Sequence, residues 1–259
     1  MTYMSPGRDQ NGGVVLSART GQVFAGAPLG ILLLDGVDCP FIPGSVGNAS
    51  TWSVPVRYKL VPGMNEHQLF GPTPAEVTPA VVQAAIELAR EGAQMITANC
   101  GFTIHYQEAV RASVDVPVLL SSLLLAPFLE RLLPRTKTLG IVTGGKDYFT
   151  PELLSASGLL EAPDRFVVAN ITEAPAWTAL WRYPGTLDVA GVESEVVRTA
   201  MDLVSTRPDV GAILLECSDL PPYAAAVQRA TRLPVFDFTS MVEFFAAGLM
   251  RKPFDGFLY

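Results

Sequence analysis

One pattern recurs at a fixed spacing in the two halves of the chain: an apolar strand, a cysteine and, later, a proline. Cys100 follows the segment MITAN and Cys217 follows AILLE, and Pro117 and Pro234 come 17 residues after them (117 − 100 and 234 − 217). A single cysteine at a strand end is usually a small buried hydrophobe. Two at matching positions favour a duplicated fold in which both have a function.

Short apolar runs alternate with helical patterns in both halves, which predicts βαβ units and parallel sheets. The predicted strands are 30–35, 57–61, 95–98 and 116–120 in the first half, and 138–143, 165–169, 212–215 and 233–236 in the second. The predicted helices are 76–91, 188–205 and 240–250, and a long loop is expected over 36–55. The predicted fold class is α/β, with two similar doubly wound parallel-sheet lobes.

The closing helix is expected to return to the first lobe. That lobe is therefore predicted to contain residues 24–122 and 236–259, and the second lobe 123–235. Residues 1–23, rich in glycine and polar residues, are expected to be a loose leader. Each cysteine follows the carboxyl end of a strand, the edge of an open α/β sheet where ligands bind. We therefore expect an active site between the lobes, flanked by both thiols.

Charge and composition limit the partners, the location and the metal sites that can be expected. The formal net charge is −7 and no basic run interrupts it, so nucleic acids and anionic membrane surfaces are not expected as partners. No segment has the length and apolar character of a membrane span, and the first residues lack the apolar region of a secretory signal, so a cytoplasmic location is expected. The chain has three cysteines and two histidines without metal-ligand spacing. We expect free thiols and no structural zinc site, with Cys39 structural.

Paired thiols suit chemistry at a carbon next to a carboxylate. Removing such a proton needs a well-placed base and stabilisation of the resulting enolate. A thiol can be that base, because the start of a helix after each strand favours a thiolate. Glu216 and Asp219 bracket Cys217 and should raise its pKa, whereas Cys100 has no acidic neighbour in sequence. Cys100 is therefore expected to be the readier thiolate.

A small carboxylate substrate would need hydroxyl groups and backbone N–H groups to hold it. Such groups are expected in the loops that follow the strands, where Gly101 would allow close approach of the backbone. Thr143 is expected at the position in the second half that matches Asp35 in the first. The predicted substrate-binding residues are Asn48, Thr51, Asn99, Gly101, Ser121, Ser122, Thr143 and Ser218. The alternative for each is ordinary turn and cap chemistry.

The chain resembles the aspartate/glutamate/hydantoin racemase superfamily. The resemblance rests on the duplicated lobes, on ITANCGF at 96–102 and on LLECSD at 214–219. It implies an active site between two α/β lobes, no cofactor, catalytic roles for Cys100 and Cys217, and a homo-oligomer as a possible assembly. Glutamate racemases typically have Cys-Asn-Thr and Cys-Thr-His, where this chain has Cys-Gly-Phe and Cys-Ser-Asp, so glutamate is not the expected substrate.

The segments IPGSVGN at 42–48 and NCGF at 99–102 are similar to a branch that includes dimethylsulfoniopropionate lyases, which use a cysteine base for β-elimination. Three functions therefore stay open. The first is a cofactor-independent racemase or epimerase of a small amino or substituted carboxylic acid, in which the two cysteines remove and return an α-proton. The second is a β-eliminating lyase on the same framework. The third is a non-catalytic bilobal protein that binds a small anion.

Overall fold

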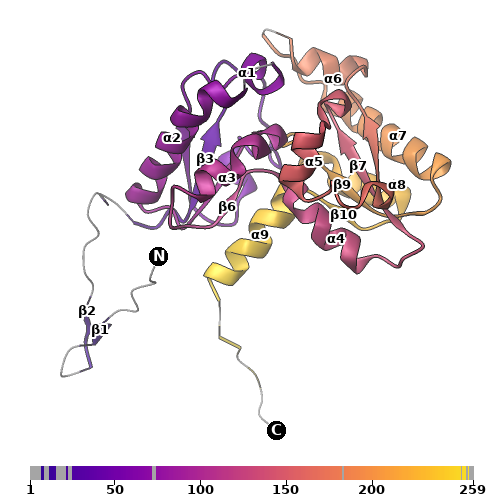
Figure 1. Cartoon of the computed structure of the whole chain (residues 1–259). Helices are drawn as coiled ribbons and strands as arrows, with labels where there is room; N and C mark the ends of the chain where they lie inside the picture. Colours follow the sequence, from indigo (N-terminus) through magenta and orange to yellow (C-terminus); the bar gives the residue numbers. More distant parts are fainter. Residues whose placement is uncertain are drawn as a thin grey trace.

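Two four-stranded parallel sheets form the centre of the molecule in the computed structural model, which describes residues 7–8, 12–15, 22, 25–71, 74–182, 184–251, 253–254 and 256. The first sheet contains β3 (Leu29–Leu33), β4 (Val56–Leu60), β5 (Met95–Ala98) and β6 (Val118–Leu119). The second contains β7 (Thr138–Thr143), β8 (Phe166–Asn170), β9 (Val210–Leu215) and β10 (Val235–Phe236). The strand orders β4-β3-β5-β6 and β8-β7-β9-β10 are the same. This confirms the predicted α/β fold with two similar lobes (Figure 1).

The duplication extends to individual backbone hydrogen bonds. The N–H of Ile96 donates to Pro117 O at 2.9 Å, and the N–H of Ile213 donates to Pro234 O at 2.9 Å. The two prolines of the repeat therefore occupy the same place beside the strand that leads to each cysteine. Because proline has no N–H, it contributes only its carbonyl to this pairing.

One expected correspondence between the halves is wrong. The N–H of Val61 donates to Leu33 O at 3.0 Å, and the N–H of Ile171 donates to Thr143 O at 3.0 Å. Thr143 therefore corresponds to Leu33 and not to Asp35. The register of a strand is fixed by its hydrogen-bonded neighbours, and a continuous apolar run gives no sequence signal for it.

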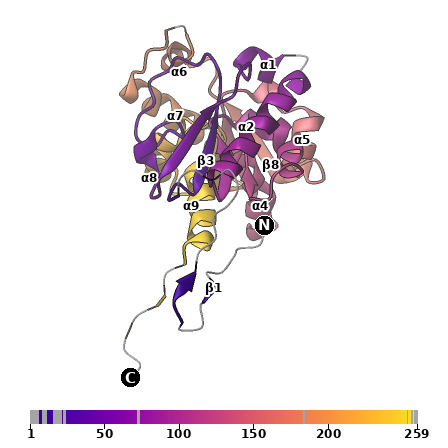
Figure 2. The same cartoon turned by 90° about the vertical axis from the view of Figure 1, so that its left-hand side faces the viewer.

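Helices cover both faces of each sheet (Figures 1 and 2). They are α1 (Glu66–Phe70), α2 (Thr78–Glu91), α3 (Gln107–Arg111), α4 (Ala126–Leu132), α5 (Pro151–Ser157), α6 (Pro175–Leu180), α7 (Val189–Thr206), α8 (Ala224–Thr231) and α9 (Phe238–Leu249). The three predicted helices correspond to α2, α7 and α9. Gly92 ends α2 with a φ of 115°, which a side chain would disfavour. Among the helices of the described residues, none combines the length and the apolar character that crossing a membrane requires.

The final helix packs against the first sheet although β10 belongs to the second. Phe238, Met241 and Val242 of α9 are buried in one cluster with Leu29 and Met95. The chain therefore passes between the lobes twice, once from β6 to α4 and once from β10 to α9. The exact lobe boundaries stay a prediction.

The predicted leader contains a short two-stranded hairpin that no sequence pattern indicated. β1 (Gly7–Arg8) pairs antiparallel with β2 (Val14–Val15), away from both lobes (Figure 2). Gly12 lies between them with a φ of 81°, a backbone conformation that glycine adopts without strain. Of residues 1–23, the structure describes 7–8, 12–15 and 22.

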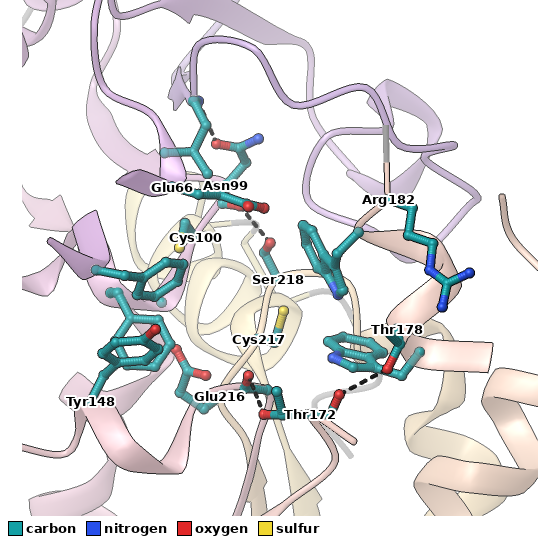
Figure 3. Close-up of a pocket in the computed structure, with 17 residues that line it drawn as sticks. Glu66, Asn99, Cys100, Tyr148, Thr172, Thr178, Arg182, Glu216, Cys217 and Ser218 are labelled. Carbon is teal, nitrogen blue, oxygen red and sulfur yellow. Dashed lines mark hydrogen bonds between the residues drawn. The ribbon is translucent and has the colours of Figure 1, made fainter. Parts of the chain in front are cut away.

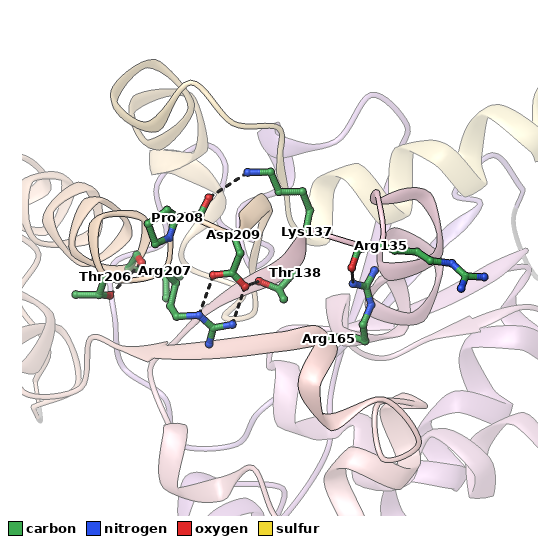
Figure 4. A network of polar contacts seen from close by, with 9 residues as sticks. Arg135, Lys137, Thr138, Arg165, Thr206, Arg207, Pro208 and Asp209 are labelled. Atoms are coloured by element: carbon green, nitrogen blue, oxygen red, sulfur yellow. Dashed lines mark hydrogen bonds and ion pairs between the residues drawn. The ribbon is translucent and has the colours of Figure 1, made fainter.

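A polar network joins the amino ends of the two central strands of the second sheet (Figure 4). The Asp209 carboxylate accepts a hydrogen bond from Thr138 Oγ1 at 3.0 Å and pairs with the Arg207 guanidinium at 2.8 Å. Lys137 Nζ donates to Pro208 O at 3.0 Å beside it. These contacts fix β7 against β9 at the end of the sheet opposite the cysteine-bearing edge.

Candidate active site

The two cysteines of the repeat line one cavity of about 350 Å³ at the carboxyl ends of the two sheets (Figure 3). Cys100 follows β5 of the first sheet and Cys217 follows β9 of the second. Each lobe therefore supplies one thiol to a shared space. Ser218 Oγ donates to Asn99 O at 2.5 Å, so the two cysteine-bearing turns are also held directly against each other.

The turns after the two cysteines differ in detail. Cys100 directly precedes a 3₁₀ helix, η3 (Gly101–Tyr106), with an extended backbone at φ −153° and ψ 133°. Cys217 begins a turn closed by the N–H of Leu220 on Cys217 O at 3.1 Å, and η7 (Pro221–Tyr223) separates this turn from α8. The expected α-helix start is thus a 3₁₀ helix in one half and a turn in the other. At each turn a backbone hydrogen bond still acts to lower the thiol pKa.

Burial is the main influence on both thiols, and it raises the pKa of each. The negative charge of Glu216 is the next cause at Cys100, and those of Asp219 and Glu216 follow at Cys217. Cys100 has no acidic neighbour in sequence, but the fold places Glu216 beside it, so the expectation that Cys100 is the readier thiolate loses its basis. Both influences favour the protonated form of each thiol in the free site.

Glu216 is a fully buried carboxyl group in the wall of the cavity. One of its oxygens, Oε2, accepts a hydrogen bond from Thr143 Oγ1 at 2.8 Å. The other, Oε1, has no hydrogen-bond partner among the described residues. Burial raises the pKa of Glu216 to about 7. Burial likewise raises the pKa of Asp219, which is 6% exposed, to about 6.

Aromatic side chains form two opposite walls of the cavity. On one side Phe70 stacks on Tyr148 with ring centroids 4.4 Å apart and meets Phe102 edge-on at 5.1 Å. On the other side Trp177 and Trp181 of the α6 region meet at 5.6 Å. All five rings line the cavity. The lining is therefore apolar and aromatic around a small number of polar groups, the usual composition of a small-molecule site.

Two charged side chains complete the lining. Glu66 of α1 is half-buried, and burial raises its pKa. Arg182 is exposed, and its guanidinium lies on the side of the cavity away from Cys100 (Figure 3). The part of the cavity nearest the thiols therefore contains carboxyl groups and aromatic rings and no cationic side chain among the residues that line it.

Three of the predicted substrate-binding residues line the cavity, namely Asn99, Gly101 and Ser218. The Asn99 side chain accepts a hydrogen bond from the N–H of Leu34 at 2.9 Å. Gly101 lies so close to Glu216 that a Cβ at this position would come within 2.6 Å of the Glu216 Cδ. The predicted need for glycine therefore has a physical cause, the approach of a buried carboxyl group.

The other five predicted residues do not line the cavity. Asn48 donates to Phe41 O at 2.9 Å and Thr51 donates to Ser45 O at 2.7 Å, within the loop that follows β3. The remaining three are fully buried: Ser121 caps η4 (Ser122–Leu125), Ser122 donates to the carbonyls of Leu215 and Glu216 at 3.1 Å, and Thr143 holds Glu216.

Most of the aromatic lining was not predicted from the sequence. Phe70, Tyr148 and Trp181 lie at the ends of short elements or in loops, where no apolar periodicity points to a common site. Phe102 belongs to the motif that contains Cys100, but the rings that it contacts, Phe70 and Tyr148, lie far from it along the chain. Only the folded arrangement brings them together.

Comparison with known proteins identifies relatives by sequence. Residues 65–133 match the AroM protein family model. Dimethylsulfoniopropionate lyase 7 of Emiliania huxleyi (strain CCMP1516) is 31% identical over 87% of this chain and 68% of its own length. A dimethylsulfoniopropionate lyase of Durusdinium sp. clade D is 30% identical over 88% of this chain and 76% of its own. The chain spans 60% of the length of the related Emiliania huxleyi lyase 6.

Solved structures share the fold at lower sequence identity. Allantoin racemase from Klebsiella pneumoniae matches 88% of this chain and 96% of its own with a TM-score of 0.56 and 17% identity. Glutamate racemase from Bacillus anthracis matches 86% of this chain and 81% of its own with a TM-score of 0.56 and 13% identity. The chain thus shares its two-lobed α/β fold with these racemases, and its sequence relationships show that it belongs to the dimethylsulfoniopropionate lyase family.

Proposed function

We propose that the protein is a lyase that eliminates a cationic leaving group from the β-carbon of a small carboxylate, as in dimethylsulfoniopropionate. The observation that carries this proposal is the aromatic lining of the cavity beside both thiols. Aromatic faces attract onium cations, and this attraction strengthens when the cation is withdrawn from water. A racemase of ordinary amino acids needs no such surface. The sequence relationship to named lyases supports the same choice.

Substrate charge also explains how a buried thiol becomes a base. Burial and the nearby carboxyl groups raise the pKa of Cys100 in the free site. A sulfonium group bound against Phe70, Phe102 and Tyr148 would bring a positive charge close to the sulfur and lower that pKa. The bound substrate would therefore favour the thiolate form of Cys100, the base that removes its α-proton. Without a ligand, the site would keep its thiols protonated.

In the proposed reaction Cys100 acts as the base. Its thiolate takes the α-proton, the electrons of that C–H bond form the carbon–carbon double bond, and the β-carbon–sulfur bond breaks with its electron pair moving to sulfur. With dimethylsulfoniopropionate the products are acrylate and dimethyl sulfide, and the proton on Cys100 returns to water. The developing negative charge on the carboxylate requires nearby hydrogen-bond donors.

The first experiment is proton NMR of the enzyme in D₂O with dimethylsulfoniopropionate, both enantiomers of aspartate and glutamate, and a hydantoin. Vinyl resonances of acrylate together with dimethyl sulfide would support the lyase. Loss of an α-proton signal without elimination would instead support the racemase, which the matched position of the two cysteines favours. No exchange with any compound would contradict both enzymes and leave the small-anion binder.

Cysteine substitutions separate the two chemistries. We expect Cys100→Ala to lower kcat/KM for elimination by about 10²–10⁴-fold, the usual effect of losing a general base. Cys217→Ala should lower it much less, because elimination needs one base. Cys39→Ala, outside the cavity, is the control. If Cys100→Ala and Cys217→Ala lowered the rate of a racemisation equally, that result would favour the racemase. Full activity of folded Cys100→Ala would overturn the assignment of Cys100 as the base.

A further inference from the structure

We propose that Glu216 is a further catalytic residue, which binds the substrate carboxylate as a neutral acid and donates its proton from Oε1 in a hydrogen bond. This inference rests on the proposed α-proton chemistry and deepens it, because it supplies the donor that the developing enolate requires. Four features of the structure support it: the hydrogen bonding of each carboxyl oxygen, the contact with the cysteine-bearing turn, the charges around the group and its equivalent in the other lobe.

The hydrogen bonds assign the proton to one oxygen. Thr143 Oγ1 accepts from the N–H of Gly145 at 3.1 Å, so its own single proton is free to donate to Glu216 Oε2 at 2.8 Å. Oε2 is therefore an acceptor. Oε1 is buried and has no partner among the described residues, although leaving a buried polar atom without a hydrogen-bond partner is unfavourable. Such an atom in a cavity wall points to a ligand that satisfies it.

The carboxyl group lies against the reacting positions. Glu216 directly precedes Cys217, and its Oε1 and Cδ occupy the space that a side chain on Gly101, next to Cys100, would need. Glu216 also lines the same cavity as both thiols. The proposal therefore places the substrate carboxylate against Oε1, beside the turn that carries Cys100.

The surroundings favour the neutral acid. The titratable groups that line the cavity with Glu216 are Cys100, Cys217, Glu66, Tyr148 and, at the rim, Arg182. Asp219 acts on Cys217 in the adjoining turn. None of the groups nearest the thiols is a cation, so none favours the carboxylate form of Glu216. Burial raises its pKa to about 7 against the opposing effect of the Thr143 hydrogen bond. A substrate carboxylate in direct contact would raise that pKa by like-charge repulsion, whereas the sulfonium group of the proposed substrate would act in the opposite direction.

The equivalent residue of the other lobe is also a neutral polar group. The N–H of Asn99 donates to Leu32 O at 3.0 Å, and that of Glu216 donates to Val142 O at 2.9 Å, so the two residues occupy the same position in their lobes. The Asn99 amide is an uncharged donor and acceptor. A protonated Glu216 gives the second lobe a matching donor. Its proton can also shift toward a carboxylate as negative charge develops there, in the way that apolar sites keep an acid neutral for hydrogen bonding.

The test compares Glu216→Gln, which keeps a donor, with Glu216→Leu, which removes it. We expect Glu216→Gln to retain kcat/KM within about tenfold and Glu216→Leu to lose about 10²–10³-fold, the effect of removing an oxyanion donor. Wild-type activity should fall as pH rises through the Glu216 pKa, because the acid is then lost, and Glu216→Gln should lack that fall. Glu76→Gln, exposed in η2 (Pro74–Val77), is the matched control.

A second readout does not depend on turnover. The infrared band of a protonated carboxylic acid should be present in the wild type with bound propionate and absent from Glu216→Gln. Equal inactivity of the Gln and Leu variants, or loss of this band when propionate binds, would overturn the inference and indicate a carboxylate that acts as a base. If dimethylsulfoniopropionate is not cleaved but the band persists, only the proposed lyase function fails.

Discussion

At the scale of single residues, Gly101 shows how tightly the site is built. A Cβ at this position would come within 2.6 Å of the Glu216 Cδ and 2.8 Å of the Glu216 carbonyl oxygen. We therefore expect Gly101→Ala to displace Glu216, to lower the free energy of unfolding by about 1–3 kcal/mol as overpacking does, and to remove most activity. Thermal unfolding and kcat/KM would measure the two effects.

The control for this substitution is Gly248→Ala in α9, where an added Cβ would meet no atom within 4 Å. There we expect unchanged activity and a gain of up to about 1 kcal/mol, because alanine favours a helix over glycine. A Gly101→Ala enzyme as active and stable as the wild type would contradict the close packing of Glu216 against this turn.

Residue by residue, the sequence predicted the centre of the site better than its walls. Cys100 and Cys217 could be found because a repeat marks them, and Asn99 and Ser218 because they adjoin the cysteines. Tyr148 and Trp181 could not, since they contribute to the cavity only through long-range packing. Thr143 is predicted to bind the substrate because of its place at the end of a strand. In the structure its role is indirect, because its hydroxyl donates a hydrogen bond that holds Glu216.

At the scale of elements, one wall of the cavity depends on a cap supplied from outside its helix. The N-cap residue of α6, Ala174, has no side chain that can accept a hydrogen bond. Glu195 of α7 replaces it and accepts from the N–H groups of Ala176 and Trp177, each at 2.9 Å. Because α6 carries Trp177 and precedes Trp181, the buried Glu195 positions one aromatic wall.

We expect Glu195→Ala to destabilise the protein by about 1–3 kcal/mol, because it leaves two helix-end N–H groups without partners. The loosened α6 should raise KM for an onium substrate more than it lowers kcat, which steady-state kinetics would resolve. Glu193→Ala, exposed two residues earlier on α7, should change neither quantity. The role of Glu195 as a cap would be disproved by equal stability of the two variants.

The elements themselves were predictable where their apolar pattern was strong. The strands at 95–98 and 138–143 have the predicted bounds, because each is a buried central strand with apolar residues on both faces. Edge strands were less well defined. β6 and β10 are only two residues long, since proline at 117 and 234 delays their start relative to prediction. The short helices α5 and α6 carry too few turns for a periodic signal.

At the scale of the whole molecule, two buried acids make stability depend on pH. The folded-state pKa values of Glu216 and Asp219, about 7 and about 6, lie above their ordinary values of 4.5 and 3.8. A raised pKa means that the fold prefers the protonated acid. The contribution of each protonated acid to the stability of the fold is fully present when the pH is below the ordinary pKa. It is lost as the pH rises through the folded-state pKa.

We therefore expect the wild type to lose several kcal/mol of stability between about pH 4 and about pH 7 relative to a Glu216→Gln/Asp219→Asn variant, since each pKa unit corresponds to about 1.4 kcal/mol. Thermal unfolding of both proteins across this range would measure the difference, and the comparison cancels the titration of other groups. Parallel pH profiles would show that the two carboxyl groups ionise normally in the fold.

The return of α9 to the first sheet has a mechanical consequence. Two stretches of chain connect the lobes, from β6 to α4 and from β10 to α9, and both lie beside the sheets (Figure 1). Separating the lobes would therefore require both crossings to move, and it would also break the hydrogen bond from Ser218 to Asn99 that joins the two cysteine-bearing turns. The two sulfur atoms are thus held on one cavity by the covalent path of the chain as well as by side-chain packing.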